Sequence, residues 1–391
     1  MKRFSALLAV LFVSFFLFTY KLTKVPPGLN GDEYGIGYNA KLISESLTDE
    51  NNNFLPLFVY AKSSDWKQPI SVYVTAVVFK IIGVSFYSLR LTSVLFVLVS
   101  ILVLYYLALS MFGKKYAIFS VLIFATTPII LIQSHLAIEN IAPIPFVLIF
   151  LWAIYLTKQD KYIRYSIASG AILGLSLFSY FGMRAMVPVI LVASLLYIRN
   201  RKKIILVLLG FSPLLILLVF GHIRYPGAVL GSYSAEIPSL YTFLYRYLSI
   251  FDISFLFFEG DITPYHSTGY FGMLLLPTLP AFIYSIYDSI VKKKEFNIYL
   301  ILTFFLIPIL FGFVPDIHRS SRLLALVPFY TLLSAYGLTK MKFKYALFIL
   351  ILILTSYGFF VLDYWNKYPE RVKDAFAPSS ANMQDYKFNT R

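Results

Sequence analysis

Two adjacent acids, Asp32 and Glu33, are the residues best suited to acid–base chemistry, and they follow a Pro- and Gly-rich stretch at residues 26–31. Acidic side chains suit the positive end of a helix dipole, so a helix is predicted to begin here. Tyr34 and Tyr38 recur at helical spacing, which predicts that this helix is amphipathic. Adjacent helical side chains diverge by about 100°, so one carboxylate is expected to do chemistry while the other supports it. The alternative is that both acids only cap the helix.

Glu139 is a third candidate, within the sequence HLAIEN at residues 135–140. It falls between two apolar segments and has only apolar residues on its N-terminal side. An acid so close to hydrocarbon is costly unless it is paired or faces a wet cavity. A functional role is therefore predicted for Glu139, the alternative being a structural acid with a satisfied partner.

Several cationic side chains are predicted to lie at the same level of the molecule as these acids. They are Lys67, Arg90, Arg184, Arg319 and Arg322. Arg319 and Arg322 are three residues apart and would share one face of a helix. Cations around acids are typical of a pocket that binds a phosphate-bearing ligand beside a base. The alternative is that these long side chains only reach from span ends to the membrane interface.

His266 is the histidine best placed for chemistry, at the end of the sequence GDITPYH. It could pair with a phosphate, or it could join Glu259 and Asp261 on a metal ion. No pair of ligands has the spacing that identifies a metal site, so the metal requirement stays unknown, with a divalent ion possible. A plain loop histidine is the remaining alternative.

The elements that must position these residues are membrane helices. The 391 residues are 59% apolar and only 14% charged, with a mean hydropathy of +0.75, whereas soluble chains place about a quarter of their residues in charge. The fold class is therefore predicted to be all-α, a polytopic membrane helical bundle. The absence of cysteine excludes disulfides, thiolate metal sites and cysteine nucleophiles.

Apolar runs long enough for a bilayer core of roughly 30 Å predict membrane spans. The eleven predicted spans are residues 4–20, 90–112, 116–134, 141–157, 164–181, 185–198, 204–221, 269–291, 297–314, 321–338 and 344–362. A further run at residues 70–86 is short and carries Lys80 in its middle. We expect it to lie along the interface or to re-enter the membrane, an ordinary twelfth span being the alternative.

The positions of the cations predict the orientation. With a cytoplasmic N-terminus, six clusters fall inside, at residues 2–3, 114–115, 158–164, 199–203, 292–294 and 340–344, and they hold 17 of the 34 Lys and Arg residues. This agrees with the positive-inside rule, and a spanning 70–86 would reverse five of the six. The net charge of +15 then reflects membrane topology, so no nucleic-acid partner is expected.

The outer side is predicted to hold the larger connections. A transmembrane domain at residues 1–362 would carry outer segments at 21–89 and 222–268, and a short extracytoplasmic tail would follow at 363–391. The first span is interpreted as an anchor and not a signal peptide, because no convincing cleavage site follows it. No Walker loop or dinucleotide fingerprint is present, so no nucleotide cofactor is expected.

The order of these motifs resembles the GT-C glycosyltransferases that use lipid-linked sugars, near protein O-mannosyltransferases and the transferases that add aminoarabinose to lipid A. The sequence GDEY at 31–34 follows the first span, KQP at 67–69 opens the interfacial segment, and GVSFYSLR at 83–90 leads into the next span. The likeness covers roughly residues 1–190 well, and 260–266 and 319–328 more loosely. Two departures are Lys-Gln-Pro for the family's Lys-Pro, and Glu139 for an acid that is often Asp. Many relatives also continue into an outer soluble domain.

The resemblance implies a hexosyl- or pentosyltransferase of the cell membrane that takes its sugar from a polyprenyl phosphate. The acceptor hydroxyl would belong to a protein, lipid or glycan on the extracytoplasmic side. Asp32 would act as general base in an inverting transfer, Glu33 would support it, and Glu139 would orient the acceptor or hold a metal. The residues implied for the donor and its phosphate are Lys67, Arg90, Arg184, His266, Arg319 and Arg322.

A lipid or sugar-lipid transporter without transferase chemistry is the main alternative function. Transporters commonly show repeated halves and broken helices at mid-membrane. No repeat is visible in this sequence, and its ionisable residues gather at one predicted face. A non-catalytic scaffold would leave the acids and cations of that face without a role. The transferase is therefore the prediction that the sequence favours.

Overall fold

The computed structural model describes residues 2–62, 64–159, 163–230 and 237–376. The elements of the N-terminal half are α1 (Lys2–Thr19), α2 (Gly31–Ser46), β1 (Val59–Tyr60), β2 (Trp66–Lys67), α3 (Pro69–Ile82), α4 (Phe86–Phe112), α5 (Lys114–Ala125), α6 (Pro128–Ser134), the 3-10 turn η1 (Glu139–Ile141), α7 (Pro143–Lys158), α8 (Ile163–Ser176) and α9 (Met183–Ile198).

The elements of the C-terminal half are α10 (Arg201–Arg224), α11 (Pro226–Leu230), α12 (Leu240–Ser249), α13 (Ile253–Phe257), α14 (Leu279–Val291), α15 (Glu295–Leu306), α16 (Val327–Lys340), α17 (Phe343–Asn366) and α18 (Tyr368–Val372). Short 3-10 turns join some of them, at Leu276–Thr278, Ile307–Phe313, Ser320–Arg322, Leu324–Leu326 and Lys373–Phe376. The predicted all-α fold class is confirmed, because the described strands form only one two-stranded hairpin.

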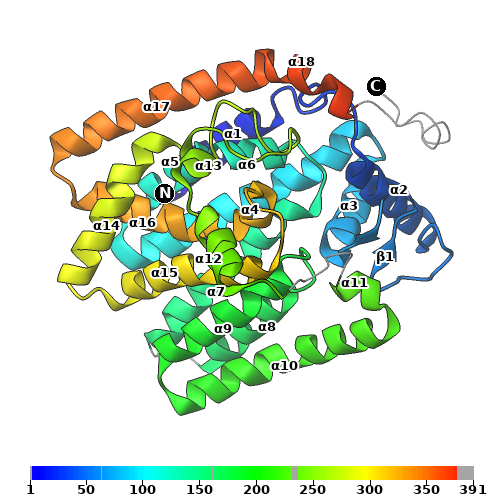
Figure 1. Cartoon of the computed structure of the whole chain (residues 1–391), viewed down its shortest axis with the longest axis horizontal. Helices are drawn as coiled ribbons and strands as arrows, with labels where there is room; N and C mark the ends of the chain where they lie inside the picture. The colour runs from blue at the N-terminus through cyan, green and yellow to red at the C-terminus, as the bar shows by residue number, and fades with distance from the viewer. Residues whose placement is uncertain (1, 63, 160–162, 231–236, 377–391) are drawn as a thin grey trace.

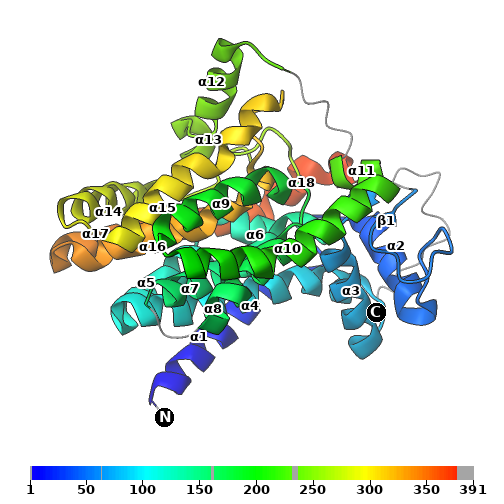
Figure 2. The same ribbon diagram turned by 90° about the horizontal axis from the view of Figure 1, so that it is seen from below.

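The long apolar helices pack side by side into one bundle (Figures 1 and 2). Helix α4 contacts α5 and α7, α16 contacts α5 and α14, and α8 packs between α7 and α10. The α8–α10 crossing is close because both helices place a glycine there. A Cβ atom added at Gly170 would lie 1.9 Å from the Val207 carbonyl oxygen, and one at Gly210 would lie 2.1 Å from the Ile167 carbonyl oxygen. Small residues of this kind allow membrane helices to approach closely.

A helix occupies each of the eleven predicted spans, but several are short. Within the described residues, five helices are long and apolar enough to cross a membrane, or six if α5 and α6, bent by 61°, form one span. The predicted span 269–291 begins late, since helical structure starts only at Leu276. The predicted span 321–338 also begins late, because 3-10 turns precede the start of α16 at Val327. Helix α17 runs to Asn366, and residues 377–391 of the predicted tail lie outside the described residues.

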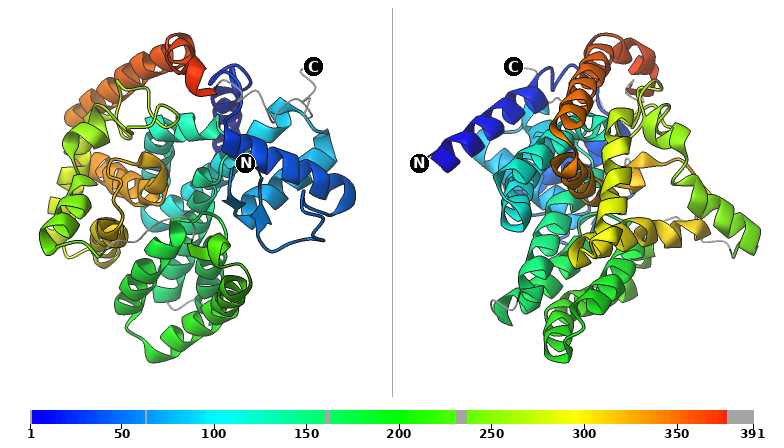
Figure 3. Two further views of the ribbon diagram at one scale, coloured as in Figure 1. Left: turned by 45° about the vertical axis from the view of Figure 1, so that its right-hand side comes forward. Right: turned by 90° about the vertical axis from the view of Figure 1, so that its left-hand side faces the viewer.

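The predicted outer segment 21–89 folds as a unit at one end of the bundle, where α2, α3 and β1 are drawn in blue (Figures 1 and 3). It has a small core of its own, in which Ile36, Ala40 and Ile43 of α2 meet Val72 and other apolar residues of α3. Helix α2 begins near Asp32 as predicted and is buried along this stripe. Helix α3 leaves apolar residues of its other face exposed, which agrees with a segment that contacts lipid.

Three of the helix junctions that carry basic clusters lie at the opposite end of the bundle from α2 and α3 (Figure 1). Three contacts join these junctions across helix ends. Lys158 Nζ lies 3.1 Å from the Tyr197 carbonyl oxygen and 3.5 Å from a Glu295 carboxylate oxygen, and Lys203 Nζ lies 2.9 Å from the Thr157 carbonyl oxygen. The junctions α7–α8, α9–α10 and α14–α15 therefore meet at one end. These three junctions therefore lie apart from the unit formed by residues 21–89.

Candidate active site

Helix α2 begins in a way that separates the roles of its two acids. Asn30 is the N-cap residue, and its side-chain oxygen accepts a hydrogen bond from the Glu33 backbone N–H at 2.9 Å. The Glu33 carboxylate accepts in return from the Asn30 backbone N–H at 3.2 Å, which completes a capping box. The Asp32 side chain is 59% exposed, whereas that of Glu33 has no exposed surface. One acid thus faces outward and the other faces the protein interior.

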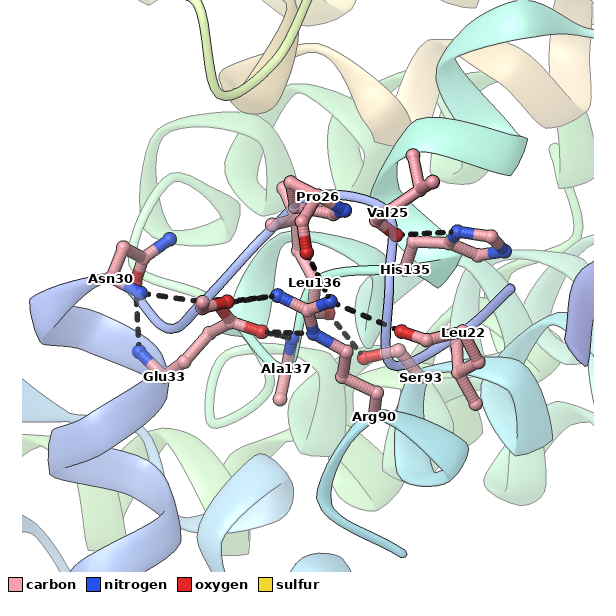
Figure 4. Close-up of polar contacts among 11 residues, drawn as sticks. Leu22, Val25, Pro26, Asn30, Glu33, Arg90, Ser93, His135, Leu136 and Ala137 are labelled. Atoms are coloured by element: carbon pink, nitrogen blue, oxygen red, sulfur yellow. Dashed lines mark hydrogen bonds and ion pairs between the residues drawn. The ribbon is translucent and has the colours of Figure 1, made fainter. Parts of the chain in front are cut away.

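Glu33 forms a fully buried ion pair with Arg90, the fifth residue of α4 (Figure 4). Arg90 Nε donates to one carboxylate oxygen at 2.9 Å, and its Nη2 donates to the other at 3.2 Å. The Ala137 backbone N–H also donates to this carboxylate, at 2.9 Å. The carboxylate therefore ties together α2, α4 and the segment that precedes Glu139.

The remaining N–H groups of Arg90 bind the loop that leads into α2 (Figure 4). Nη1 donates to the carbonyl oxygens of Leu22 at 3.0 Å and Pro26 at 2.9 Å, and Nη2 donates to that of Gly28 at 2.7 Å. All five guanidinium N–H groups thus have acceptors, as a buried arginine requires. Glu33 and Arg90 do not line the cavity described below, and their contacts position the loop and the helix that carry Asp32.

A cavity of about 490 Å³ opens beside the start of α2. Six of the residues singled out from the sequence line it: Asp32, Lys67, Glu139, His266, Arg319 and Arg322. Their elements are far apart in sequence, since α2 and β2 provide the first two residues and the turns around 266 and 320 provide the last three. The fold therefore brings these side chains around one space, in which Asp32 with Lys67 is called the first wall, and Arg319 and Arg322 with His266 are called the second or basic wall.

Asp32 and Lys67 form the first wall of this cavity. Lys67 Nζ lies 2.5 Å from Asp32 Oδ1, and the lysine side chain is 6% exposed. Lys67 is held by the hairpin, in which Val59 pairs with Lys67 and Tyr60 pairs with Trp66. The buried lysine stem and the hairpin fix one side of the Asp32 carboxylate, while its other side remains open to the cavity.

Glu139 lies in the turn η1 and accepts a hydrogen bond from the Gln68 backbone N–H. The Gln68 side-chain oxygen in turn accepts from Arg184 Nη2 at 2.5 Å. Arg184 Nη1 donates to the carbonyl oxygens of Ala228 and Val229, at 2.8 and 2.6 Å. Arg184 lines a smaller neighbouring cavity and not the large one, so its contacts serve to position Gln68 and α11.

His266 faces the cavity from the segment after α13, and Gln133 of α6 orients its ring. The Gln133 amide nitrogen lies 2.7 Å from His266 Nδ1, so an amide that donates there leaves the ring proton on Nε2. Burial lowers the pKa of His266 below its usual value, against the opposing effects of the Asp261 and Asp32 carboxylates. The imidazole is therefore neutral at pH 7, with an N–H available for a ligand.

Arg319 and Arg322 form the second wall. Arg319 directly precedes the turn Ser320–Arg322, and Arg322 is the last residue of that turn. Arg322 Nη2 donates to an Asp316 carboxylate oxygen at 2.9 Å, and Arg319 Nη2 lies 3.8 Å from the same oxygen. Arg319 also donates to Thr263 Oγ1. Buried Asp261 fixes this turn, because its carboxylate accepts from Ser320 Oγ at 2.9 Å. The Nε of Arg319 is buried and has no hydrogen-bond partner among the described residues.

The described residues do not bring together His266, Glu259 and Asp261 as the metal ligands that the sequence suggested. No group of three or more His, Cys, Asp or Glu side chains gathers there to hold an ion. Glu259 is absent from the cavity lining, and Asp261 is engaged in the turn that carries Arg319.

Sequence reasoning missed several residues of the cavity, including Asn140, Tyr265 and Ser321. It also missed Gln133, which lies on a helix that reads as entirely apolar apart from its last residues. Only Asn140 carried a signal, as a polar neighbour of Glu139 at the end of an apolar run. The others become recognisable only when the turns around 266 and 320 are folded against α6.

The helices, the unit formed by residues 21–89 and the cavity define a polytopic membrane protein of the GT-C fold, as the sequence resemblance predicted. Residues 67–223 match the family model of dolichyl-phosphate-mannose-protein mannosyltransferase. No curated protein sequence matches the chain significantly.

Two solved structures have a similar fold. ArnT from Cupriavidus metallidurans in the apo state has 17% sequence identity and a TM-score of 0.63, over 90% of this chain and 62% of that one. The oligosaccharyltransferase AglB from Archaeoglobus fulgidus, in complex with an inhibitory peptide and a dolichol-phosphate, has 14% identity and a TM-score of 0.55, over 93% of this chain and 56% of that one.

ArnT bound to undecaprenyl phosphate is a further match, with 16% identity and a TM-score of 0.59, over 90% of this chain and 62% of that one. The chain thus spans about three fifths of the length of the structures it matches. At these identities the likeness establishes the fold, and the activity has to be argued from the site itself.

Removing the arginine of the buried pair tests its structural role. Arg90→Ala leaves the Glu33 carboxylate buried without its partner, so the free energy of unfolding should fall by about 3–5 kcal/mol. Thermal unfolding of the purified protein in detergent measures the change. Arg371→Ala, which breaks an ion pair at the surface, should lower the midpoint much less.

A double variant distinguishes the stability lost by leaving a buried charge without its partner from the stability lost with side-chain packing. Glu33→Gln combined with Arg90→Met removes both charges and should be more stable than Arg90→Ala alone. An Arg90→Ala protein as stable as the wild type would contradict the structural role assigned to the pair.

Proposed function

We propose that the protein is a membrane glycosyltransferase that moves a sugar from a polyprenyl-phosphate donor to an acceptor hydroxyl. The observation that carries this proposal is the one cavity that Asp32, Arg319 and Arg322 line together. A carboxylate can accept the proton of an attacking hydroxyl, and guanidinium groups can stabilise the phosphate that departs. The matched structures that were solved with undecaprenyl phosphate and with a dolichol-phosphate support a lipid phosphate as the donor.

The proposed step is a single displacement at the anomeric carbon of the donor sugar. The acceptor oxygen forms the new bond to this carbon as the bond to the phosphate oxygen breaks, so the configuration inverts. The proton of the acceptor goes to the Asp32 carboxylate, and the bonding electrons leave with the polyprenyl phosphate. Lys67, at 2.5 Å, keeps the Asp32 carboxylate in place for this role.

The basic wall has the groups that a phosphate needs. Arg319 and Arg322 present guanidinium groups to the cavity, and the buried Nε of Arg319 has no other acceptor among the described residues. The neutral His266 adds an N–H donor at the same wall. Guanidinium groups bind phosphate oxygens with two parallel hydrogen bonds, which fixes the direction in which the leaving group departs.

A smaller cavity of about 160 Å³ offers space for the start of the donor's lipid chain. It shares Tyr180, Phe181 and Arg322 with the large cavity, and apolar residues such as Phe311 and Val314 form most of the rest of its lining. An isoprenoid chain in this space would continue directly from a phosphate held at Arg322. Glu139, fixed by the Gln68 backbone, is placed to orient the acceptor opposite it.

We further propose that the cavity faces the extracytoplasmic side and that the N-terminus is cytoplasmic. Three of the basic clusters meet at the other end of the bundle, and such clusters favour the cytoplasmic side of a membrane. The domain division predicted from the sequence follows from the same orientation, with α2 to α3 and α11 to α13 in the two outer segments.

Asp32→Asn tests the general base. The amide keeps the size of the side chain but cannot take up the proton at neutral pH, so the rate of sugar transfer should fall by about 100-fold or more. Donor binding should persist, because the phosphate contacts lie on the other wall. Transfer and donor binding are measured in the same membrane preparation, with Glu45→Gln, an exposed acid on the same helix, as the matched control.

The outcome for Glu33→Gln distinguishes the two acids. Glu33 is buried against Arg90, so this substitution should lower thermal stability and should slow transfer less than Asp32→Asn does. Near-normal transfer by Asp32→Asn would refute the base assignment. A larger loss in a folded Glu33→Gln protein would assign the base to Glu33.

Arg319→Ala and Arg322→Ala test the phosphate wall. A charge-assisted contact is worth roughly 1.5–3 kcal/mol, so each variant should weaken donor binding by about 10-fold or more. Arg→Lys should recover only part of the loss, because lysine cannot form the two parallel bonds. Arg371→Ala is the matched control, since its side chain is 29% exposed, as is that of Arg319, but lies outside the cavity lining. Unchanged donor binding in both cavity variants would contradict the assignment.

Single cysteines in this cysteine-free chain test the orientation. A cysteine replacing Glu45 of α2 should react with an impermeant thiol reagent in intact cells, because this exposed position belongs to the proposed outer unit. A cysteine replacing Lys202, exposed at the start of α10, should react only after the membrane is opened. The reverse pattern would place the cavity on the cytoplasmic side.

A further inference from the structure

A second cavity, of about 340 Å³, adjoins the first and has a different chemistry. Its lining consists of four aromatic residues and three short polar ones: Phe58, Tyr60, Trp66, Tyr225, Asp49, Asn51 and Asn53. Trp66 lines both cavities, and the next residue is Lys67, which contacts Asp32. A ligand in the second cavity would therefore lie next to the strand that carries Lys67, the partner of the proposed base.

Three rings of this cavity meet at different angles. The centroids of Tyr60 and Trp66 are 5.2 Å apart with planes inclined by 65°, and those of Trp66 and Tyr225 are 5.4 Å apart with planes inclined by 50°. Tyr60 is 44% exposed, so a face of this surface is open to a ligand. The result is an angled aromatic surface, and Trp66 forms its centre.

The polar rim is rigid and rich in amide groups. The Asp49 carboxylate accepts hydrogen bonds from the backbone N–H groups of Asn51 and Asn53, at 2.9 and 2.8 Å. These hydrogen bonds hold the turn at residues 49–53. The Asn51 amide donates to the Tyr60 carbonyl oxygen at 2.8 Å, which fastens the turn to β1. The amide oxygens of both asparagines have no hydrogen-bond donor assigned to them among the described residues, and can accept from a ligand.

These features fit one class of ligand. A pyranose carries polarised C–H bonds on its ring faces, which pack on the electron-rich face of an aromatic ring, and hydroxyl groups on its edge, which bind amides. Among the described residues, the lining contains no Lys, Arg or His, which disfavours a phosphate or another anion. We infer that the second cavity binds the acceptor, and that the acceptor is a saccharide, held so that one hydroxyl reaches Asp32. This inference rests on the proposed function.

Binding measured without a donor tests the inference independently of catalysis. Saturation-transfer NMR is applied to the purified protein in lipid nanodiscs with a panel of methyl glycosides and short oligosaccharides, and with hydroxyl-containing peptides. We expect at least one saccharide to bind. Tyr60→Ala and Tyr225→Ala should each weaken that binding by about fivefold or more. Tyr241→Ala, an exposed tyrosine on α12 that does not line the cavity, should bind as the wild type does.

Kinetics then separate this inference from the proposed function. Release of sugar from a panel of polyprenyl-phosphate sugars reports the function, whereas the KM for the saccharide acceptor reports the second cavity. Tyr60→Ala should raise this KM, and Tyr60→Phe, which keeps the aromatic ring, should restore it. Donor consumption without saccharide binding would overturn the inference and leave the proposed function standing. Saccharide binding that is unaffected by Tyr60→Ala and Tyr225→Ala, or binding of peptides alone, would also overturn it.

Discussion

The geometry of the cavity depends on the ion pair between Glu33 and Arg90, whose side chains are both withdrawn from water. Two such charges are stable in the protein interior only when every donor and acceptor has a partner. Here the partners are the capping box of α2, the backbone of the loop from Leu22 to Gly28, and the Ala137 N–H. Satisfying the pair therefore fixes the loop, the helix start and the approach to η1 relative to α4. Asp32 points outward because its neighbour is held inward.

The rest of the cavity follows from segments that fold back onto this frame. The hairpin brings Lys67 to Asp32 and Gln68 to Glu139, and α6 supplies Gln133 to orient His266. The basic wall has its own support, because Asp261 holds the turn that carries Arg319. The Asp32–Lys67 pair and Arg319 are thus positioned by separate networks. This division allows Asp32 to accept a proton while Arg319 and Arg322 bind a phosphate.

Much of this arrangement could be predicted from the sequence, and the limits have physical reasons. Composition and hydropathy predicted the membrane bundle, and the Pro/Gly stretch with its acids predicted the start of α2. Six of the nine predicted site residues line one cavity. Arg90 and Arg184 do not, because a single sequence cannot distinguish a cation that faces a cavity from one that binds backbone carbonyls inside the protein. The late starts of helical structure at Leu276 and Val327 were missed because irregular membrane segments can be as apolar as helices.

The central claim is that one cavity separates a proton acceptor from a phosphate-binding wall. An experimental structure with a non-reactive donor analogue, a polyprenyl phosphonate sugar, tests this most directly through the position of the phosphonate. The account predicts that the phosphonate oxygens contact the guanidinium groups of Arg319 and Arg322, with the Asp32 carboxylate on the opposite side of the anomeric carbon. A phosphonate bound outside this cavity, or on the same side of the anomeric carbon as Asp32, would contradict it.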